Sequence, residues 1–258
     1  MFRIPENKIC FKEWCFVSAT DLPKINGTMN SVGKNSKSQQ RFIADASHEL
    51  RTPITIIRGY ADMLEKYGKE DEELFKESVG EIQKAAKNMQ TLVESMLFLA
   101  RADSGVHVLN KIKFDVGEVL RGLIATFNDP RIELNIDSPQ KVFGDPEYLK
   151  IMFREFISNS LEYSDDNIKI EILNVDGRTQ IKFIDSGIGI SPENLERIFE
   201  RFYRADKSRT KADESISAGL GLSIAKRIAD AHEIKIEIDS IPDEGTTFTL
   251  IFPPIFEN

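Results

Sequence analysis

Two long runs of regularly spaced apolar residues constrain the fold of this chain more than any other feature. In the first run, apolar side chains recur at steps of three and four: Ile43, Ala46, Leu50, Ile54, Ile57, Ala61 and Leu64. The second run has the same alternation: Phe75, Val79, Ile82, Ala86, Met89, Val93, Met96 and Ala100. This spacing places the apolar residues on one face of an α-helix. The sequence therefore predicts two long amphipathic helices, the first of which ends near Gly68.

A short acidic connection separates the two runs, so the predicted helices should pair as an antiparallel hairpin. Three further apolar residues, Ala85, Leu92 and Leu99, widen the face of the second helix. Two helices alone cannot bury faces of this width, whereas a four-helix bundle can. The sequence therefore predicts a homodimer in which each chain contributes one hairpin.

The pattern changes after Ser104 and Gly105, where short strand-like segments begin to alternate with helical ones. The predicted strands are residues 132–137, 141–145, 168–174, 179–185, 234–239 and 246–252. The predicted helices are residues 146–163, 192–203 and 219–231. Asp176-Gly177 lies between two of the strands and indicates a hairpin turn. Together these elements predict an α/β sandwich domain with a mixed sheet.

These patterns divide the chain into three parts and predict a multidomain fold, α followed by α+β. Residues 1–37 are a weakly structured N-terminal segment or the remnant of an upstream domain, residues 38–105 form the helical hairpin, and residues 112–256 form the α/β domain. A length of 258 residues is enough for about two domains. With 41% hydrophobic residues, the chain has the apolar content that packed cores require.

Composition argues against several classes of function. A net charge of -8 disfavours binding of nucleic acid, which favours proteins with excess lysine and arginine. Cys10 and Cys15 have no histidine nearby at metal-ligand spacing, so neither a disulfide framework nor a zinc site is indicated. Because no run of 18 apolar residues occurs, we expect the chain as given to be cytoplasmic. The alternative is the cytoplasmic portion of a membrane-anchored receptor, which would reach the membrane only through a segment absent from this chain.

The segment SHELRTP, residues 47–53, lies within the first predicted helix. His48 is two residues from the apolar positions on either side, hence roughly 200° around the helix from the apolar face, and should be exposed. Thr52 is four residues further on and shares the face of His48. Pro53 lacks the amide that would bond to the carbonyl of Glu49, so it should bend the helix beside the histidine. An isolated surface histidine usually has no chemical role, so its interpretation depends on this context.

Two glycine-containing segments of the second domain could approach a ligand closely. In IDSGIGI, Asp185 precedes Gly187 and Gly189 at the end of a predicted strand, so a carboxylate lies beside backbone that could pack against a flat ring. In SAGLGLS, Gly219 and Gly221 stand where a helix begins, so backbone amides and the helix dipole could hold phosphates. Each pattern is weak by itself, because glycines at such places often form only a turn.

A third segment, REFISNSLEYS, places Glu155 and Asn159 one helical turn apart on one face. Two oxygen-bearing side chains at this spacing could reach a hydrated magnesium ion. In isolation, two exposed polar residues would be the simpler interpretation.

The segment RFIADASHELRTPIT resembles the phosphoacceptor box of the sensor histidine kinases of two-component systems. REFISNSLEYS, IDSGIGI, IFERFYRAD, SAGLGLS and DEGTTF resemble, in order, the N, G1, F, G2 and G3 boxes of the same family. The resemblance covers about residues 38–254 and implies the Bergerat-type ATP fold that gyrase and the heat-shock chaperone ATPases share. It also implies ATP and Mg²⁺ as ligands, and the receiver domain of a response regulator as partner.

The resemblance assigns roles to individual residues. It implies that His48 accepts the γ-phosphoryl group of ATP, that Glu49 is the general base, and that Thr52 positions water when the phosphorylated regulator is dephosphorylated. The nucleotide-binding residues that it implies are Asn159, Tyr163, Asp185, Gly187, Gly189, Tyr203, Arg204, Lys207, Gly219, Leu220, Gly221 and Leu222. It assigns Asp185 to the adenine amino group and Mg²⁺ to Asn159 and Glu155. The polar segment ADKSRTKADESIS, residues 205–217, should be a mobile lid.

The sequence also departs from the pattern of this family. Glu162 stands where a phosphate-contacting lysine is common, and Glu155 where asparagine is frequent. Ser217, Asp243 and the pair Glu233-Ile234 replace usual glycines. Because Glu155 resembles the water-activating base of the related ATPases, a free-standing ATPase is one alternative function. A non-catalytic dimeric scaffold is another, although a scaffold would need neither His48 nor Asp185.

Overall fold

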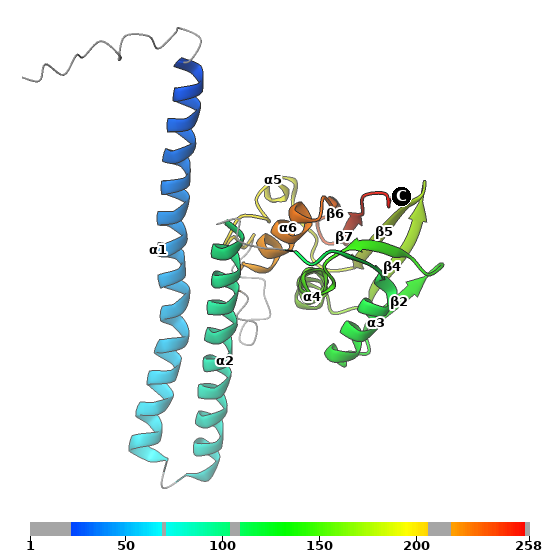
Figure 1. Ribbon diagram of the computed structural model, residues 1–258. Coiled ribbons are helices and arrows are strands. Elements are labelled where there is room, and N and C mark those ends of the chain that lie inside the picture. Colours follow the sequence, from blue (N-terminus) through cyan, green and yellow to red (C-terminus); the bar gives the residue numbers. More distant parts are fainter. Residues whose placement is uncertain (1–21, 69–70, 104–108, 206–217, 256–258) are drawn as a thin grey trace, which may run out of the picture. The chain divides into compact units, whose positions relative to one another are not determined.

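A computed structural model describes residues 22–68, 71–103, 109–205 and 218–255, and describes only the backbone of residues 22–40 (Figure 1). The chain divides into two compact units, residues 1–48 and residues 49–258. Within the described ranges, no helix is both long enough and apolar enough to cross a membrane.

Two long helices form the first part of the chain, so the predicted helical hairpin is confirmed. Helix α1 spans Leu22–Tyr67 and helix α2 spans Glu72–Asp103. Helix α1 begins at Leu22, inside the segment for which we expected weak structure or the remnant of an upstream domain, and a helix that has formed adds further residues at low cost even where they are polar. The helix also continues through Pro53. Residues 1–21 lie outside the described ranges.

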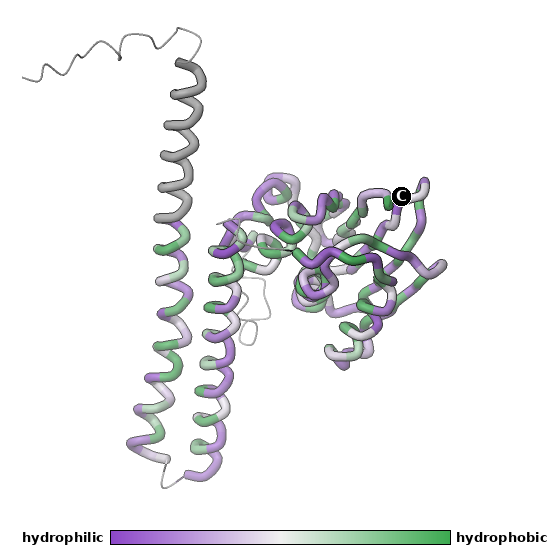
Figure 2. The backbone as a smooth tube through the Cα atoms, in the orientation of Figure 1, coloured by the Kyte–Doolittle hydropathy of each residue, from purple (hydrophilic) through white to green (hydrophobic). Residues whose placement is uncertain are grey.

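The apolar face of the hairpin is only partly buried within one chain. The buried residues of α2 recur every seven positions: Ser78, Ala85, Leu92 and Leu99. Residues at this spacing form one narrow line along the helix, which a single neighbouring helix can cover. Members of the predicted stripe are exposed instead, including Phe75 at 48%, Val93 at 40% and Ile54 at 52%. Figure 2 shows apolar positions spaced along both helices. A single chain therefore leaves the wide apolar surface that the four-helix hypothesis would cover.

The second domain contains the predicted mixed sheet, with strand order β2-β4-β5-β7-β6. Strands β2 (Ile132–Ile136) and β4 (Ile168–Val175) are parallel, and the remaining neighbours are antiparallel. The other members are β5 (Arg178–Asp185), β6 (Lys235–Ile241) and β7 (Gly245–Ile251). Asp176 and Gly177 have positive φ angles of 52° and 76° and form the predicted turn between β4 and β5.

Helices cover this sheet and complete a two-layer sandwich (Figure 1). They are α3 (Val116–Phe127), α4 (Pro146–Tyr163) and α6 (Gly221–Ala231). The rings of Phe156 on α4, Phe183 on β5 and Phe248 on β7 meet at the centre, with centroid distances from Phe156 of 5.2 and 5.1 Å. All three are fully buried, so α4 is anchored directly over the middle of the sheet.

Three elements differ from the sequence prediction. Strand β1 (Ile112–Asp115), which pairs with β3 (Lys141–Gly144) in a separate ribbon, and helix α3 were not predicted. Helix α5 spans only Pro192–Leu195, whereas we expected a helix over residues 192–203. The rest of that segment forms turns, and Phe202 has a positive φ of 61°, which an α-helix does not allow.

Candidate functional site

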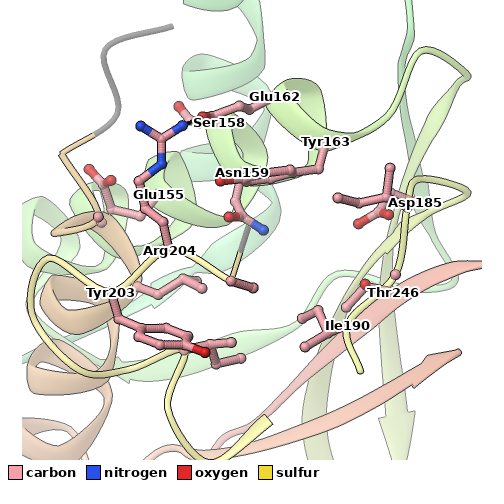
Figure 3. Close-up of a pocket in the computed structure, with 17 residues that line it drawn as sticks. Glu155, Ser158, Asn159, Glu162, Tyr163, Asp185, Ile190, Tyr203, Arg204 and Thr246 are labelled. Carbon is pink, nitrogen blue, oxygen red and sulfur yellow. Dashed lines mark ion pairs between the residues drawn. The ribbon is translucent and has the colours of Figure 1, made fainter. Parts of the chain in front are cut away.

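A pocket opens between α4, the end of β5 and the start of α6 (Figure 3). Its open volume is about 920 Å³, including the solvent-exposed mouth. It brings together the following predicted binding residues: Asn159, Tyr163, Asp185, Gly189, Tyr203, Arg204, Gly219, Gly221 and Leu222, with Glu155 beside them. Segments that are far apart in the sequence thus converge on one cavity.

Helix α4 supplies one wall of the pocket. Asp145 caps its start by accepting the Glu147 amide at 3.1 Å, and the opposite face of the helix is buried in the core. Glu155, Asn159 and Glu162 are four and three residues apart, so they lie on the same face, and all three line the pocket. The helix therefore presents two carboxylates and an amide to one cavity.

Asp185 ends strand β5 at the other side of the pocket. Alternate residues of β5 are buried, and Asp185 takes the next inward position, so its carboxylate lies inside the domain with only 6% of the residue exposed. Oδ1 accepts the Gly187 amide at 3.0 Å, and Oδ2 accepts the Ser160 hydroxyl at 3.2 Å. Burial raises the pKa of Asp185, while these hydrogen bonds and one from the Thr246 amide oppose that rise. A buried carboxylate held in this way can accept a hydrogen bond from a ligand amino group.

The start of α6 forms the phosphate-binding candidate. Leu220, at the N-cap position, has no side-chain oxygen that could accept from the first amides of the helix. A Cβ on Gly221 would collide with the carboxylate of Glu155, which would have to move, so this carboxylate lies directly against the start of α6. Backbone amides at a helix start favour anions. The arrangement therefore suits phosphate groups at this end of the pocket.

Glu155 lies against this helix start. Burial raises the pKa of its carboxyl group, and the nearby Arg154 lowers it. A cation in the pocket would favour the ionised form. Glu155 and Asn159 together offer oxygen ligands that fit Mg²⁺. This ion usually binds one or two carboxylates together with water and substrate phosphates. No group of three His, Cys, Asp or Glu residues in the described ranges could hold a metal ion, so phosphate and water would have to complete the coordination.

Aromatic and aliphatic side chains form the remaining wall. Tyr203 is held by Asn194, which accepts its hydroxyl hydrogen bond at 2.6 Å, and by the Arg197 guanidinium 4.3 Å from its ring centre. Sequence reasoning missed several lining residues: Ser158, Ile188, Ile190, Ile198, Ala205 and Thr246. The alternation of IDSGIGI offered a signal for the two isoleucines. Thr246 lies in the segment DEGTTF, and its register places it opposite Asp185.

Two predicted nucleotide-binding residues do not line the pocket, and a third is not described. Leu220 is 3% exposed and packs in the core. Gly187 serves the fold, because a Cβ there would collide with the carbonyl oxygen of Tyr163. Gly187 therefore allows two segments of protein backbone to approach closely, whereas we expected it to allow a ligand ring to approach. Lys207 and residues 206–217, which include most of the predicted lid, lie outside the described ranges.

The predicted phosphoacceptor residues lie on α1. His48 and Thr52 are exposed and Glu49 is partly exposed, so the prediction of an accessible imidazole is confirmed for the single chain. Pro53 has no amide hydrogen, so the Glu49 carbonyl lacks its usual helical donor. His48 belongs to the first unit, whereas the pocket belongs to the second.

Two family models match the chain. The model described as "His Kinase A (phospho-acceptor) domain" matches residues 38–105. The model described as "Histidine kinase-, DNA gyrase B-, and HSP90-like ATPase" matches residues 144–255. The first match contains His48, and the second contains every residue that lines the pocket.

Curated relatives include the sensor histidine kinase YkoH of Bacillus subtilis, which is 36% identical over 244 residues, covering 91% of this chain and 53% of the relative. The signal transduction histidine-protein kinase ArlS of Staphylococcus haemolyticus is 32% identical over 242 residues, covering 90% of this chain and 52% of the relative. The chain thus spans about half the length of the curated relatives it matches.

Solved structures also resemble the chain. The histidine kinase AdeS of Acinetobacter baumannii has a TM-score of 0.61 and 26% identity, covering 80% of this chain and 96% of that chain. ShkA in complex with AMPPNP has a TM-score of 0.60 and 26% identity, covering 80% of this chain and 44% of that chain. ThkA in complex with the response regulator protein TrrA shares the fold, with a TM-score of 0.64 and 24% identity over 87% of this chain and 66% of that chain.

Proposed function

The chain belongs to the histidine kinases of two-component systems, and on that premise we propose that it transfers the γ-phosphoryl group of ATP to His48. The phosphoryl group then passes to an aspartate in the receiver domain of a response regulator. The observation that carries this proposal is the convergence of the buried Asp185 carboxylate, the α6 start and the oxygen donors of α4 on one pocket. ShkA, a solved structure of similar fold, holds AMPPNP, which supports ATP as the ligand of this pocket.

The pocket gives each end of ATP a partner. Asp185 accepts a hydrogen bond from the adenine amino group, and the apolar wall with Ile188 and Ile190 packs on the ring. The amides at the start of α6 and the Arg204 guanidinium hold the phosphates. Mg²⁺, bound by Asn159 and Glu155, would neutralise phosphate charge during transfer.

At the acceptor, one ring nitrogen of His48 attacks the γ-phosphorus. The new N–P bond forms as the bond from phosphorus to the bridging oxygen of ADP breaks, and ADP leaves with that electron pair. Glu49 accepts or orients the imidazole proton, which keeps the attacking nitrogen unprotonated. An exposed imidazole suits this role, because both the nucleotide and the regulator must reach it.

The partners follow from the same premise. Exposed apolar residues such as Ile54 and Phe75 support a homodimer through a four-helix bundle. ThkA has been solved with a response regulator, and we propose a partner of the same class here. Thr52 lies on the same exposed face of α1 as His48. This position supports a second activity, in which water removes the phosphoryl group from the phosphorylated regulator.

Incubation with γ-labelled ATP and Mg²⁺ tests the proposal. We expect an acid-labile, alkali-stable label on the protein that His48→Gln removes, because a phosphoramidate has this stability. Release of free phosphate without labelled protein would instead favour an ATPase. That second candidate is motivated by Glu155, whose raised pKa suits a water-activating base. Absence of both products would leave the non-catalytic scaffold.

A further inference from the structure

One ion pair lies inside the nucleotide pocket. The Arg204 Nη2 atom is 4.0 Å from Glu162 Oε1, and the two side chains are 23% and 14% exposed. Figure 3 shows the Arg204 guanidinium beside Glu162, at the end of the pocket opposite Asp185. This is the end at which Glu155 meets the start of α6, where the proposed function places the phosphates.

The balance of charge makes this ion pair important. Three of the described lining residues carry carboxyl groups: Glu155, Glu162 and Asp185. Arg204 carries the only cationic side chain among the lining residues in the described ranges. A guanidinium binds phosphate in a bidentate manner, which makes it the natural partner of the triphosphate. Glu162 and the phosphates therefore need the same group.

The geometry of the pair indicates that Glu162 holds Arg204 only weakly. A separation of 4.0 Å is too long for a hydrogen bond. Oε1 of Glu162 is buried and accepts no hydrogen bond from any residue in the described ranges. A phosphate oxygen in bidentate contact would bind the guanidinium more strongly. However, removal of Arg204 from Glu162 would leave a buried carboxylate without its counter-charge, which costs free energy.

We propose that Glu162 sets the nucleotide affinity of this pocket by competing with the phosphates of ATP for Arg204. The inference rests on the proposed function, because it assumes that the ligand carries phosphate. The competition is strongest for ATP without metal, because Mg²⁺ neutralises part of the negative charge of the phosphates, which Glu162 repels. Glu162 thus selects the magnesium complex over the free nucleotide, in addition to lowering affinity for both.

Calorimetric titration of the full chain with ATP, in EDTA and in Mg²⁺, tests this proposal. Glu162→Gln keeps the shape of the side chain and should tighten binding about 1.4-fold to fivefold in EDTA, the range expected for a partly exposed ion pair, and by a smaller factor in Mg²⁺. Glu147→Gln is the matched control, because Glu147 is an exposed residue of the same helix that does not line the pocket. The Glu147→Gln variant should bind ATP with the same affinity as the unmodified chain.

The same titration in an Arg204→Gln background separates competition from simple repulsion. If Glu162 acts through Arg204, the tightening by Glu162→Gln disappears in that background. Equal tightening with and without Arg204, or no change in EDTA when the unmodified chain binds ATP, overturns the inference and leaves the proposed function intact. If no variant binds ATP, both are refuted. Circular dichroism spectra that match between variants exclude misfolding as the cause.

Discussion

His232 at the end of α6 links two elements of the ATP-binding domain. Its side chain is 3% exposed. Nε2 accepts the Asp145 amide at 3.0 Å, so the ring hydrogen lies on Nδ1, which donates to the Ile228 carbonyl at 2.8 Å. Asp145 in turn caps α4, the helix that carries Asn159. The neutral imidazole therefore supports the wall of the nucleotide pocket indirectly.

Acidification should destabilise this domain through His232. Burial lowers the pKa of His232, aided by Lys111, and outweighs the opposing hydrogen bond to Ile228 and the charge of Asp145. Below the unfolded pKa of about 6.5, the unfolded chain binds the proton more tightly than the folded one, so stability is present above that pH and is lost as pH falls. Between pH 7.5 and 5.5 the loss is at most about 1.4 kcal/mol.

Urea unfolding of the full chain at several pH values measures this effect, with near-ultraviolet circular dichroism to follow the packed aromatic residues of the domain. His232→Gln cannot titrate, so it should be less stable at pH 7.5 by about 1–3 kcal/mol, from the hydrogen bonds it loses, but less dependent on pH. The reasoning is refuted if both proteins have the same pH slope, because Glu155 and Asp185, whose pKa values are raised, contribute equally to both.

Two further predictions concern the metal site and the assembly. Asn159→Ala should abolish labelling by γ-labelled ATP while sedimentation still shows a dimer, because the residue lines the pocket and does not belong to the hairpin helices; retained labelling would exclude Asn159 from the magnesium site. Residues 38–105 alone should form a stable dimer in analytical ultracentrifugation, because the exposed Phe75 and Val93 need a covering surface; a folded monomer would contradict the bundle.

The local sequence pattern was sufficient to predict features that depend on a single helix or turn. The period of the apolar residues predicted the hairpin, and the position of His48 between apolar neighbours predicted its exposure. Asp176-Gly177 predicted its turn, because few dipeptides adopt two successive positive φ angles. Even so, the centre of the buried face of α2 was misplaced. Burial there depends on how many helices cover the face, which one chain's pattern does not specify.

Contacts between distant segments could not be predicted from the sequence. Gly187 was expected to face a ring, yet it packs on the Tyr163 carbonyl, which comes from another element. The sequence showed Glu162 only as a departure from a common lysine, whereas the structure pairs it with Arg204, which is 42 residues away in the sequence. Strand β1 was missed because a four-residue strand leaves little periodic signal.

Strand β5 lies between β4 and β7 in the sheet, and Asp185 is its final residue. Side chains of a strand alternate between the two faces, so the insertion or deletion of one residue within β5 would turn this carboxylate away from the nucleotide. A loop could absorb such a change, but both edges of β5 are hydrogen-bonded to neighbours. The hydrogen bonds that hold the sheet together thus fix the position of Asp185, so the proposed recognition of adenine should not tolerate a change in the length of β5.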